Sequence, residues 1–183
     1  MGVDKLALSW QGSTIIETII STLTSAGMGD ITLVLRPAQE DVISLLKNQT
    51  KTGLVKLALL DPFFENDMLA SIQCGISSLS SEYLYAMICL GDQPHIQSKI
   101  VNRLLTARIN NDKSLIVPSY QMKRGHPWLI KNNLWSDLLS SPHQMTPRSF
   151  LNAHEKETQY VRVENDSILK DIDTPEDYNS LKE

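Results

Sequence analysis

A carboxylate follows directly on an apolar stretch of the chain. Residues 84–90 read LYAMICL, and they are followed by Gly91, Asp92 and Gln93, with Pro94 next. Almost no polar residue interrupts the stretch, which is typical of a parallel strand buried on both faces. Ligands of open α/β sheets bind just beyond the carboxyl ends of such strands, and a glycine there lets the backbone approach a ligand. Asp92 is therefore a candidate ligand-site residue; the alternative is a solvated aspartate that caps the next helix.

A second group of carboxylates lies near the end of the sequence. Asp171 and Asp173 are two residues apart in a segment expected to be extended, so both side chains should point to the same side. Like charges held together favour a cation between them, and carboxylate pairs suit Mg²⁺. The residues that follow have a structural explanation, because Thr174 is a good N-cap, Pro175 suits the first helical position and acidic residues 176–177 complement the helix dipole. A metal site and a plain helix cap both remain open for this segment.

The third candidate is a cationic turn. Residues 123–127 read KRGHP, and their positive charge and glycine could hold a phosphate or another anion. A basic turn is more often simply solvated, so the motif alone leaves both interpretations open. Lys5 and Arg148 are single cations whose ordinary interpretation is a surface charge.

Size and composition limit the classes of protein that need consideration. The chain has 183 residues and a formal net charge of −4, which predicts a single domain over residues 1–183 and gives no sign of a nucleic-acid partner. No apolar stretch is long enough to span a bilayer and the first residues lack a signal-peptide pattern, so we expect no membrane partner. Cys74 and Cys89 both lie in apolar runs, where we interpret them as small buried hydrophobic residues. These features predict a cytoplasmic protein.

Strands alternate with helices along most of the chain. This order predicts an α/β fold with a mostly parallel sheet, right-handed crossovers and helices on both faces. Thr14 and Glu17 have the spacing of a capping box at the start of the first helix. We place the strand at 84–90 near the centre of the sheet. Periodicity predicts strands at 31–35, 55–60, 84–90, 115–117, 128–130 and 160–163, and helices at 14–26, 40–47, 66–79, 96–109, 133–139, 148–154 and 175–182.

Taken together and in this order, the motifs resemble those of the molybdenum cofactor cytidylyltransferases, which are MobA-like NTP transferases. The resemblance covers essentially the whole chain, and its motifs are specific in combination although each is weak alone. Residues 5–17 are similar to the family opening "K.LLPW.G.T..E", and Arg148 matches the arginine of a "GaR" motif. The other matching segments are DPFFENDMLASIQCGI at 61–76, GDQP at 91–94, RGHP at 124–127 and DIDTPEDY at 171–178.

This resemblance implies a Rossmann-like three-layer α/β/α domain of the nucleotide-diphospho-sugar transferase type, with its first strand missing. It implies Mg²⁺-dependent transfer of a cytidylyl group from CTP to the phosphate of molybdopterin, with release of pyrophosphate. By analogy, Asp92 is the principal Mg²⁺ ligand and a catalytic residue, Asp171 or Asp173 completes the metal site, and Lys5 contacts the nucleotide phosphates as the second catalytic residue. The substrate-binding positions that it implies are Ser71, Gly91, Gln93, Arg124, His126 and Arg148, with Arg124 and His126 on the acceptor side.

The chain departs from the family pattern at its start. Family members have an additional N-terminal strand and a Gly-rich "LAAG.S.RMG" loop, whose backbone amides cradle the triphosphate. Met1 and Gly2 match the last two residues of that loop. A missing strand would leave two neighbouring strands with unpaired backbone groups. We expect either that the coding sequence continues upstream of Met1 or that a shortened chain binds nucleotides poorly; Asp61 and Asp67, in place of the usual Asn and Gly, add to the question of nucleotide affinity.

Two other functions fit the same motifs. One keeps the fold and transfers the nucleotidyl group to a different acceptor, such as a sugar phosphate. The other is a non-catalytic accessory protein that binds the cofactor or a molybdoenzyme such as a xanthine dehydrogenase, which the missing loop favours. Binding of Mg·CTP separates the accessory role from the two enzymatic ones.

Overall fold

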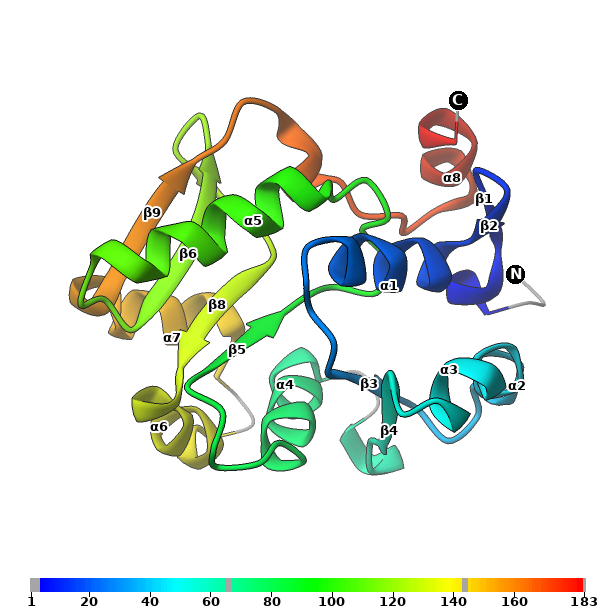
Figure 1. Ribbon diagram of the computed structural model, residues 1–183, viewed down its shortest axis with the longest axis horizontal. Coiled ribbons are helices and arrows are strands. Elements are labelled where there is room, and N and C mark those ends of the chain that lie inside the picture. Colours follow the sequence, from blue (N-terminus) through cyan, green and yellow to red (C-terminus); the bar gives the residue numbers. More distant parts are fainter. Residues whose placement is uncertain (1–3, 65–66, 143–144, 183) are drawn as a thin grey trace.

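The computed structural model describes residues 4–64, 67–142 and 145–182, which form sheets flanked by helices (Figure 1). No helix among these residues is both long enough and apolar enough to cross a membrane. The strands are β1 (Ser9–Trp10), β2 (Ser13–Thr14), β3 (Ile31–Leu35), β4 (Val55–Leu59), β5 (Tyr85–Ile88), β6 (Leu115–Tyr120), β7 (Lys123–Arg124), β8 (Trp128–Lys131) and β9 (Thr158–Arg162).

The main strands fall into two hydrogen-bonded groups. Strands β3 and β4 are parallel, with Ile31 opposite Val55. The larger group has the order β5-β8-β6-β7, and β9 pairs with β6 in parallel. Because β8 is antiparallel to both β5 and β6, the strands β5, β6 and β9 run in one direction. Strand β5 thus lies at the end of its group and not, as the apolar run at 84–90 suggests, between two strand neighbours.

Helices cover both faces of the larger group. Ile116 of β6 packs with α5, whereas Leu115 and Val117 pack with α4, α6 and α7, because successive residues of a strand face opposite ways. Helix α1 packs beside α5. The helices are α1 (Ile15–Ser25), α2 (Glu40–Leu45), α3 (Lys47–Lys51), α4 (Met68–Ser77), α5 (Ser98–Ala107), α6 (Trp135–Ser140), α7 (Pro147–Ala153) and α8 (Pro175–Leu181), and short 3₁₀ turns include η1 (Lys5–Ala7) and η6 (Asp166–Leu169).

Local sequence signals explain several of these boundaries. The Thr14 side chain accepts a hydrogen bond from the amide of Glu17, so the predicted cap of α1 is confirmed. The turn between β1 and β2 has φ of 46° at Gln11 and 87° at Gly12, the left-handed conformation of a tight hairpin turn that Gly12 readily adopts. The helix expected over 40–47 divides at Leu46 into α2 and α3.

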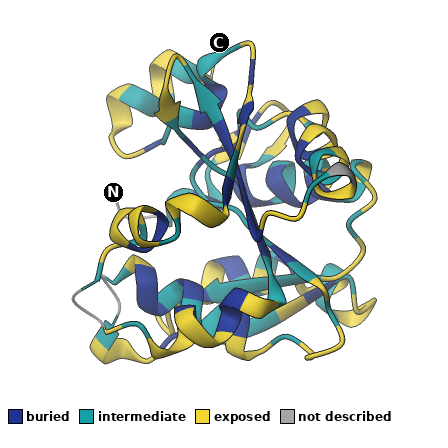
Figure 2. Cartoon of the chain, turned by 90° about the vertical axis from the view of Figure 1, so that its left-hand side faces the viewer, coloured by how far each residue is buried: buried dark blue, intermediate teal, exposed yellow. Residues whose placement is uncertain are grey.

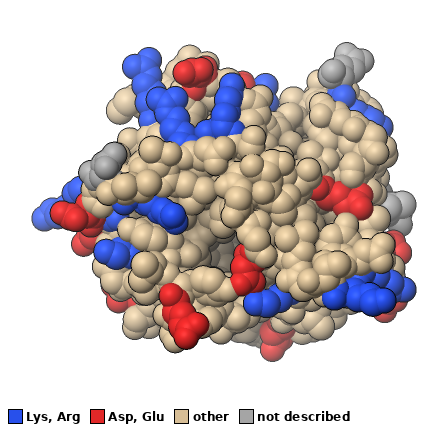
Figure 3. Space-filling view, in the orientation of Figure 1, with Lys and Arg blue, Asp and Glu red and all other residues tan. Residues whose placement is uncertain are grey.

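The apolar core consists of two main clusters. One joins α1, the end of β3 and α2, and the other joins α4, β5, β8, α6 and α7. Buried residues follow the strands and the inward faces of the helices (Figure 2). Between β3 and β5 lies a cavity of about 640 Å³, lined also by α1 and α4. A hollow is visible there in the middle of the face drawn in Figure 3, bordered mainly by uncharged residues.

Candidate active site

The first element of the chain that contributes to the site is η1, which positions Lys5. The Asp4 carboxylate accepts a hydrogen bond from the amide of Leu6 at 2.9 Å and so caps this 3₁₀ turn. The other oxygen of Asp4 accepts a hydrogen bond from the buried side-chain amide of Gln39, next to α2. The turn is therefore fixed from two sides, and Lys5 projects from it toward the segment that follows β5.

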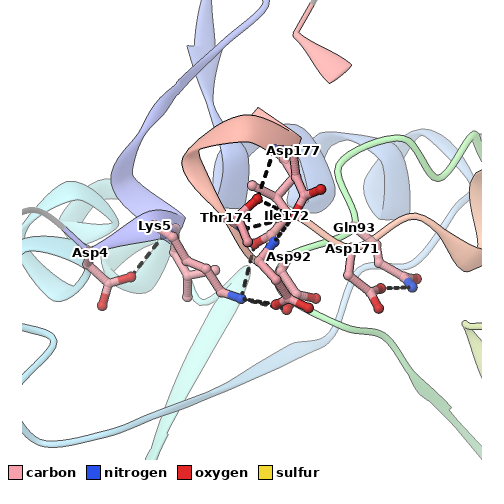
Figure 4. A network of polar contacts seen from close by, with 10 residues as sticks. Asp4, Lys5, Asp92, Gln93, Asp171, Ile172, Thr174 and Asp177 are labelled. Carbon is pink, nitrogen blue, oxygen red and sulfur yellow. Dashed lines mark hydrogen bonds and ion pairs between the residues drawn. The ribbon is translucent and has the colours of Figure 1, made fainter. Parts of the chain in front are cut away.

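Lys5 lies between two of the predicted carboxylates. Its Nζ donates hydrogen bonds to Asp92 at 2.8 Å and to the carbonyl of Ile172 at 3.2 Å (Figure 4). It also donates a hydrogen bond to Asp173 at 3.2 Å. Burial opposes the charge of Lys5, but the hydrogen bond and charge of Asp92, followed by those of Asp173, outweigh it and raise the pKa of Lys5. Lys5 thus stays protonated and neutralises part of the negative charge of this cluster.

Asp171 belongs to the same cluster but has a different partner. Its Oδ1 accepts a hydrogen bond from the side-chain amide of Gln93, which is buried. Burial raises the pKa of the Asp171 carboxyl, the bond from Gln93 opposes this change, and the negative charges of Asp92 and Asp173 raise the pKa further. The three carboxylates therefore lie close enough to repel one another, although Lys5 bridges only two of them.

The carboxyl-terminal segment is anchored on both sides of Ile172. Ile172 is fully buried and its amide donates to the carbonyl of Asp92 at 3.0 Å, which ties residues 171–173 to the end of β5. Asp177 accepts hydrogen bonds from the amides of Asp173 and Thr174, and the Thr174 side chain caps α8 in return. The predicted helix cap is thus present, and it also holds Asp173 beside Lys5.

The cluster has some, but not all, of the features of a cation-binding site. Oδ1 of Asp92 is buried and has no hydrogen-bond partner, so one carboxylate oxygen is available for a further ligand. Within residues 4–64, 67–142 and 145–182, however, no three His, Cys, Asp or Glu side chains converge as a metal-binding group. The position between Asp92 and Asp173 is held by the ammonium group of Lys5. It therefore stays a prediction that Asp92, Asp171 and Asp173 bind a metal ion together.

The RGHP segment divides into an inward and an outward part. His126 stacks on Trp128 with ring centroids 4.6 Å apart, and burial lowers the pKa of His126 to about 4 despite the opposing charge of nearby Asp92. Arg124 instead bonds Glu155 at 3.0 Å and Asn152 at 2.6 Å. The structure thus brings His126 toward the site while Arg124 is engaged with α7 and the turn that follows it.

Gly125 is required here by packing. A Cβ atom on Gly125 would lie 2.2 Å from the carbonyl oxygen of Ile168, which is backbone and cannot move aside easily. Gly91 has a milder role, because a Cβ there would lie 3.2 Å from the side chain of Leu6, the residue after Lys5. Both glycines let segments distant in sequence approach closely around the site.

The remaining predicted positions are not all near Lys5. Ser71, in the first turn of α4, lines the same cavity as Lys5, Gly91 and Asp92. Arg148 is exposed on α7, which Figure 1 places well away from α8 and η1. Their roles in substrate binding stay predictions.

Several residues of the site escape the sequence motifs. Gln39 lies 35 residues from Asp4, and no local pattern indicates that they meet. The carbonyl of Ile172 that accepts from Lys5 belongs to the backbone, so no residue type could indicate it. Asp4 is different, because an aspartate directly before the first residue of a short helical turn is a recognisable cap.

The fold and this charged cluster define the class of protein. Beyond the end of one strand of an α/β sheet, a carboxylate, a lysine and a second acidic segment lie together beside a cavity. This arrangement is suited to charged phosphate substrates. Residues 1–158 match the family model of the MobA-like NTP transferase domain, and the chain therefore belongs to this family of nucleotidyltransferases.

Individual relatives agree with this assignment. The molybdenum cofactor cytidylyltransferase of Escherichia coli (strain K12) is 25% identical over 183 residues, which are 100% of this chain and 89% of that enzyme. The crystal structure of Rv0371c from Mycobacterium tuberculosis H37Rv superimposes with a TM-score of 0.84 over 99% of this chain and 89% of that one, at 17% identity. The structure of Rv0371c in complex with manganese gives a TM-score of 0.77 at 18% identity, over 97% of this chain and 90% of that one. The two crystal structures confirm the predicted α/β fold.

Proposed function

We propose that this chain transfers the cytidylyl group of CTP to the phosphate of the molybdenum cofactor, molybdopterin, and releases pyrophosphate. The observation that carries the proposal is the placement of Lys5 between Asp92 and Asp173 at the end of β5. The choice of CTP and molybdopterin rests on the E. coli cytidylyltransferase, which aligns along the whole chain.

The reaction needs positioning and charge neutralisation more than a strong base. An oxygen of the acceptor phosphate attacks the α-phosphorus of CTP, the bond from that phosphorus to the oxygen bridging to the β-phosphate breaks, and pyrophosphate leaves with the bond electrons. Lys5 Nζ, a cation already fixed at 2.8 Å from Asp92, can donate to a phosphate oxygen as negative charge shifts to the leaving group. Ser71 lines the same cavity and can bind the nucleotide through its hydroxyl group.

A divalent cation is part of this proposal. Asp92, with its free buried oxygen, and Asp173 or Asp171 would hold the ion, and the manganese complex of Rv0371c supports a divalent ion in this fold. When bound, Mg²⁺ would neutralise charge on the α-phosphate and on the departing pyrophosphate. Lys5 then exchanges its carboxylate partners for phosphate oxygens. We assign His126 to the acceptor side, because Asp92 is near enough for its charge to act on the pKa of His126, and we propose Arg124 and Arg148 as further acceptor contacts.

Pyrophosphate release tests this function. The chain is incubated with Mg·CTP and molybdopterin, and the proposal predicts release that requires both substrates. ATP or GTP in place of CTP, and a sugar phosphate in place of molybdopterin, test the nucleobase and the acceptor separately. Release with a sugar phosphate but not with molybdopterin would keep the reaction class and overturn the acceptor.

A second function is favoured by one specific observation. Lys5 already compensates Asp92 and Asp173, so the cluster is stable without a metal ion, as a non-catalytic protein would need. Such a protein would bind the cofactor or a molybdoenzyme and leave CTP unbound. Calorimetric titration with Mg·CTP separates the two functions, because binding in the micromolar range argues against the accessory role.

A further inference from the structure

His95, which directly follows the GDQP motif, places both of its ring nitrogens inside the protein. Among the described residues, neither Nδ1 nor Nε2 of His95 has a hydrogen-bond partner. A neutral imidazole carries one donor and one acceptor, whereas a protonated imidazole carries two donors and a positive charge. Because a buried charge without partners costs far more than a buried neutral group, this position accepts His95 as a neutral ring and disfavours the protonated one.

The ring of His95 lies where three segments of the chain meet. It makes a T-shaped contact with the buried Trp10 of β1, with ring centroids 5.0 Å apart, and Trp10 in turn contacts Tyr178 of α8 at 6.2 Å. The hydroxyl group of Tyr178 donates a hydrogen bond to the carbonyl of Ser9. Figure 1 shows α8 beside β1 and β2. We call His95, Trp10 and Tyr178 the aromatic joint, because they connect the segment after β5 with the first hairpin and the last helix.

Helix α8, which the aromatic joint holds in place, supports part of the charged cluster. The amide of Asp173 donates to Asp177 in the first turn of α8, and the carboxylate of Asp173 accepts a hydrogen bond from Lys5. Ile172 is anchored separately, by its burial and by its bond to the carbonyl of Asp92. A displacement of α8 would therefore pivot after Ile172 and take Asp173 away from Lys5.

The charges on the η6 side of His95 do not favour its protonated form. Asp166 and Lys170 form an ion pair at 3.1 Å, so their effects on the ring oppose each other. Burial lowers the pKa of His95, the backbone of Leu181 opposes this effect, and Lys170 and Asp166 act in opposite directions. His95 thus keeps its neutral form to a lower pH in the closed joint than in water.

The groups on α8 and β1 leave His95 as the candidate for a change of charge in the joint. The Tyr178 hydroxyl is engaged with Ser9 and accepts a hydrogen bond from Lys182 Nζ at 2.8 Å, and β1 contributes the uncharged Ser9 and Trp10. At the start of α8, the hydrogen bond from the side chain of Thr174 lowers the pKa of Asp177. Asp177 therefore stays ionised in mild acid and continues to accept the amide of Asp173.

We propose that His95 is a pH-sensitive latch, whose neutral ring keeps the aromatic joint closed and whose protonated ring opens it and releases α8 and Asp173. In the open form the ring is hydrated and has its ordinary pKa of 6.5, so the latch is closed above this pH. Below it, protonation favours the open form by up to about tenfold for each pH unit. The inference concerns the position of α8 and does not depend on the reaction that the chain catalyses.

Hydrogen exchange measured by mass spectrometry tests the latch on the intact chain. Exchange of amides in 176–182 is compared with that of amides in α4 at pH 7.5 and 5.5, because the intrinsic effect of pH and any change in global stability act on both segments. We expect the protection of α8 relative to α4 to fall by about three- to tenfold at pH 5.5. His95→Phe keeps a ring against Trp10 but cannot be protonated, so its relative protection should be the same at both pH values.

A second variant shows whether protection of α8 reports on the aromatic joint. Tyr178→Phe loses the hydrogen bond to Ser9, so α8 should be less protected at both pH values, while the further loss at pH 5.5 stays because His95 is unchanged.

Circular dichroism shows whether His95→Phe is folded, and if it is not, the two pH values on the unaltered chain still decide. Equal relative protection of α8 at pH 7.5 and 5.5 in the unaltered chain, or the same loss in His95→Phe as in the unaltered chain, would overturn the proposal.

Discussion

Lys5 and Asp92 are 87 residues apart in the sequence, and their side chains meet at 2.8 Å. The side chain of Lys5 is 34% exposed and that of Asp92 is 22% exposed, so the pair is only partly screened by water. Because the same ammonium also reaches Asp173, one lysine ties the turn before α1, the end of β5 and the carboxyl-terminal segment into a single charged cluster.

Replacing Lys5 by methionine should separate two effects. Turnover of CTP should fall by roughly 10²–10³-fold, because a positioned cation facing the developing phosphate charge is lost. Binding of Mn²⁺ without nucleotide should become tighter, since the two carboxylates lose their internal cation. Electron paramagnetic resonance of Mn²⁺ measures the second effect. The control is Arg103→Ala, which removes an exposed pair at 3.8 Å with Glu164 and should change neither quantity; unchanged turnover in Lys5→Met would contradict the role of Lys5.

The two aspartates of the acidic segment should differ as metal ligands. Asp173 shares Lys5 with Asp92, whereas Asp171 is bonded to Gln93. Asp173→Asn should therefore weaken Mn²⁺ binding by at least about tenfold more than Asp171→Asn, which keeps an oxygen for Gln93 to donate to. Titration of both variants with Mn²⁺ measures the difference. A greater loss in Asp171→Asn would assign the second ligand to Asp171.

His126 should make stability depend on pH. Its pKa is about 4 in the folded chain against an ordinary 6.5, so the unfolded chain takes up the proton first as pH falls. The folded chain therefore has its full stability with respect to His126 above pH 6.5. Between pH 6.5 and pH 4 the free energy of unfolding falls by at most about 3 kcal/mol because of this residue. Urea unfolding at pH 7, 5.5 and 4.5 should show a smaller loss of unfolding free energy in His126→Gln than in the unaltered chain. Equal losses would show that His126 does not remain neutral and buried.

Gly125 and Gly29 form a matched pair for a test of packing. Alanine at 125 would place Cβ at 2.2 Å from the Ile168 carbonyl, so Gly125→Ala should lower the free energy of unfolding by about 1–3 kcal/mol or more. At Gly29 nothing lies within 4 Å of the added atom and φ is not in the left-handed region, so Gly29→Ala should be neutral or slightly stabilising. Denaturant unfolding compares the two. A tolerated Gly125→Ala would mean that Ile168 lies further away.

Most of the fold follows from local pattern. The run at 31–35 coincides with β3, and the spacing of Thr14 and Glu17 locates the start of α1, because both signals depend only on neighbouring residues. The exposed edge of β5 does not follow from its own sequence, since an apolar strand reads the same whether its neighbour is present or absent. Only the structure shows that β5 has a single strand neighbour, β8.

The site was predictable where a motif carries it. The motifs single out Asp92 and Asp173, and the structure places both beside Lys5; their roles as metal ligands stay predictions. The partner of Asp171 does not follow from the sequence. In an extended segment, residues two apart point to the same side, but this does not tell which side chain lies opposite them. Arg124 shows the same limit, since its bond to Glu155 depends on how the turn at 155–157 folds back.

Pyrophosphate release by Asp92→Asn is the most direct test of the central claim, which is that Asp92 at the end of β5 is the essential carboxylate of a nucleotidyltransferase. The assay uses Mg·CTP and molybdopterin, with Asp112→Asn as a control that changes an exposed aspartate. We predict release by the unaltered chain and by Asp112→Asn, and a loss of at least about 10³-fold in Asp92→Asn. Release by Asp92→Asn at the rate of the unaltered chain would contradict the account.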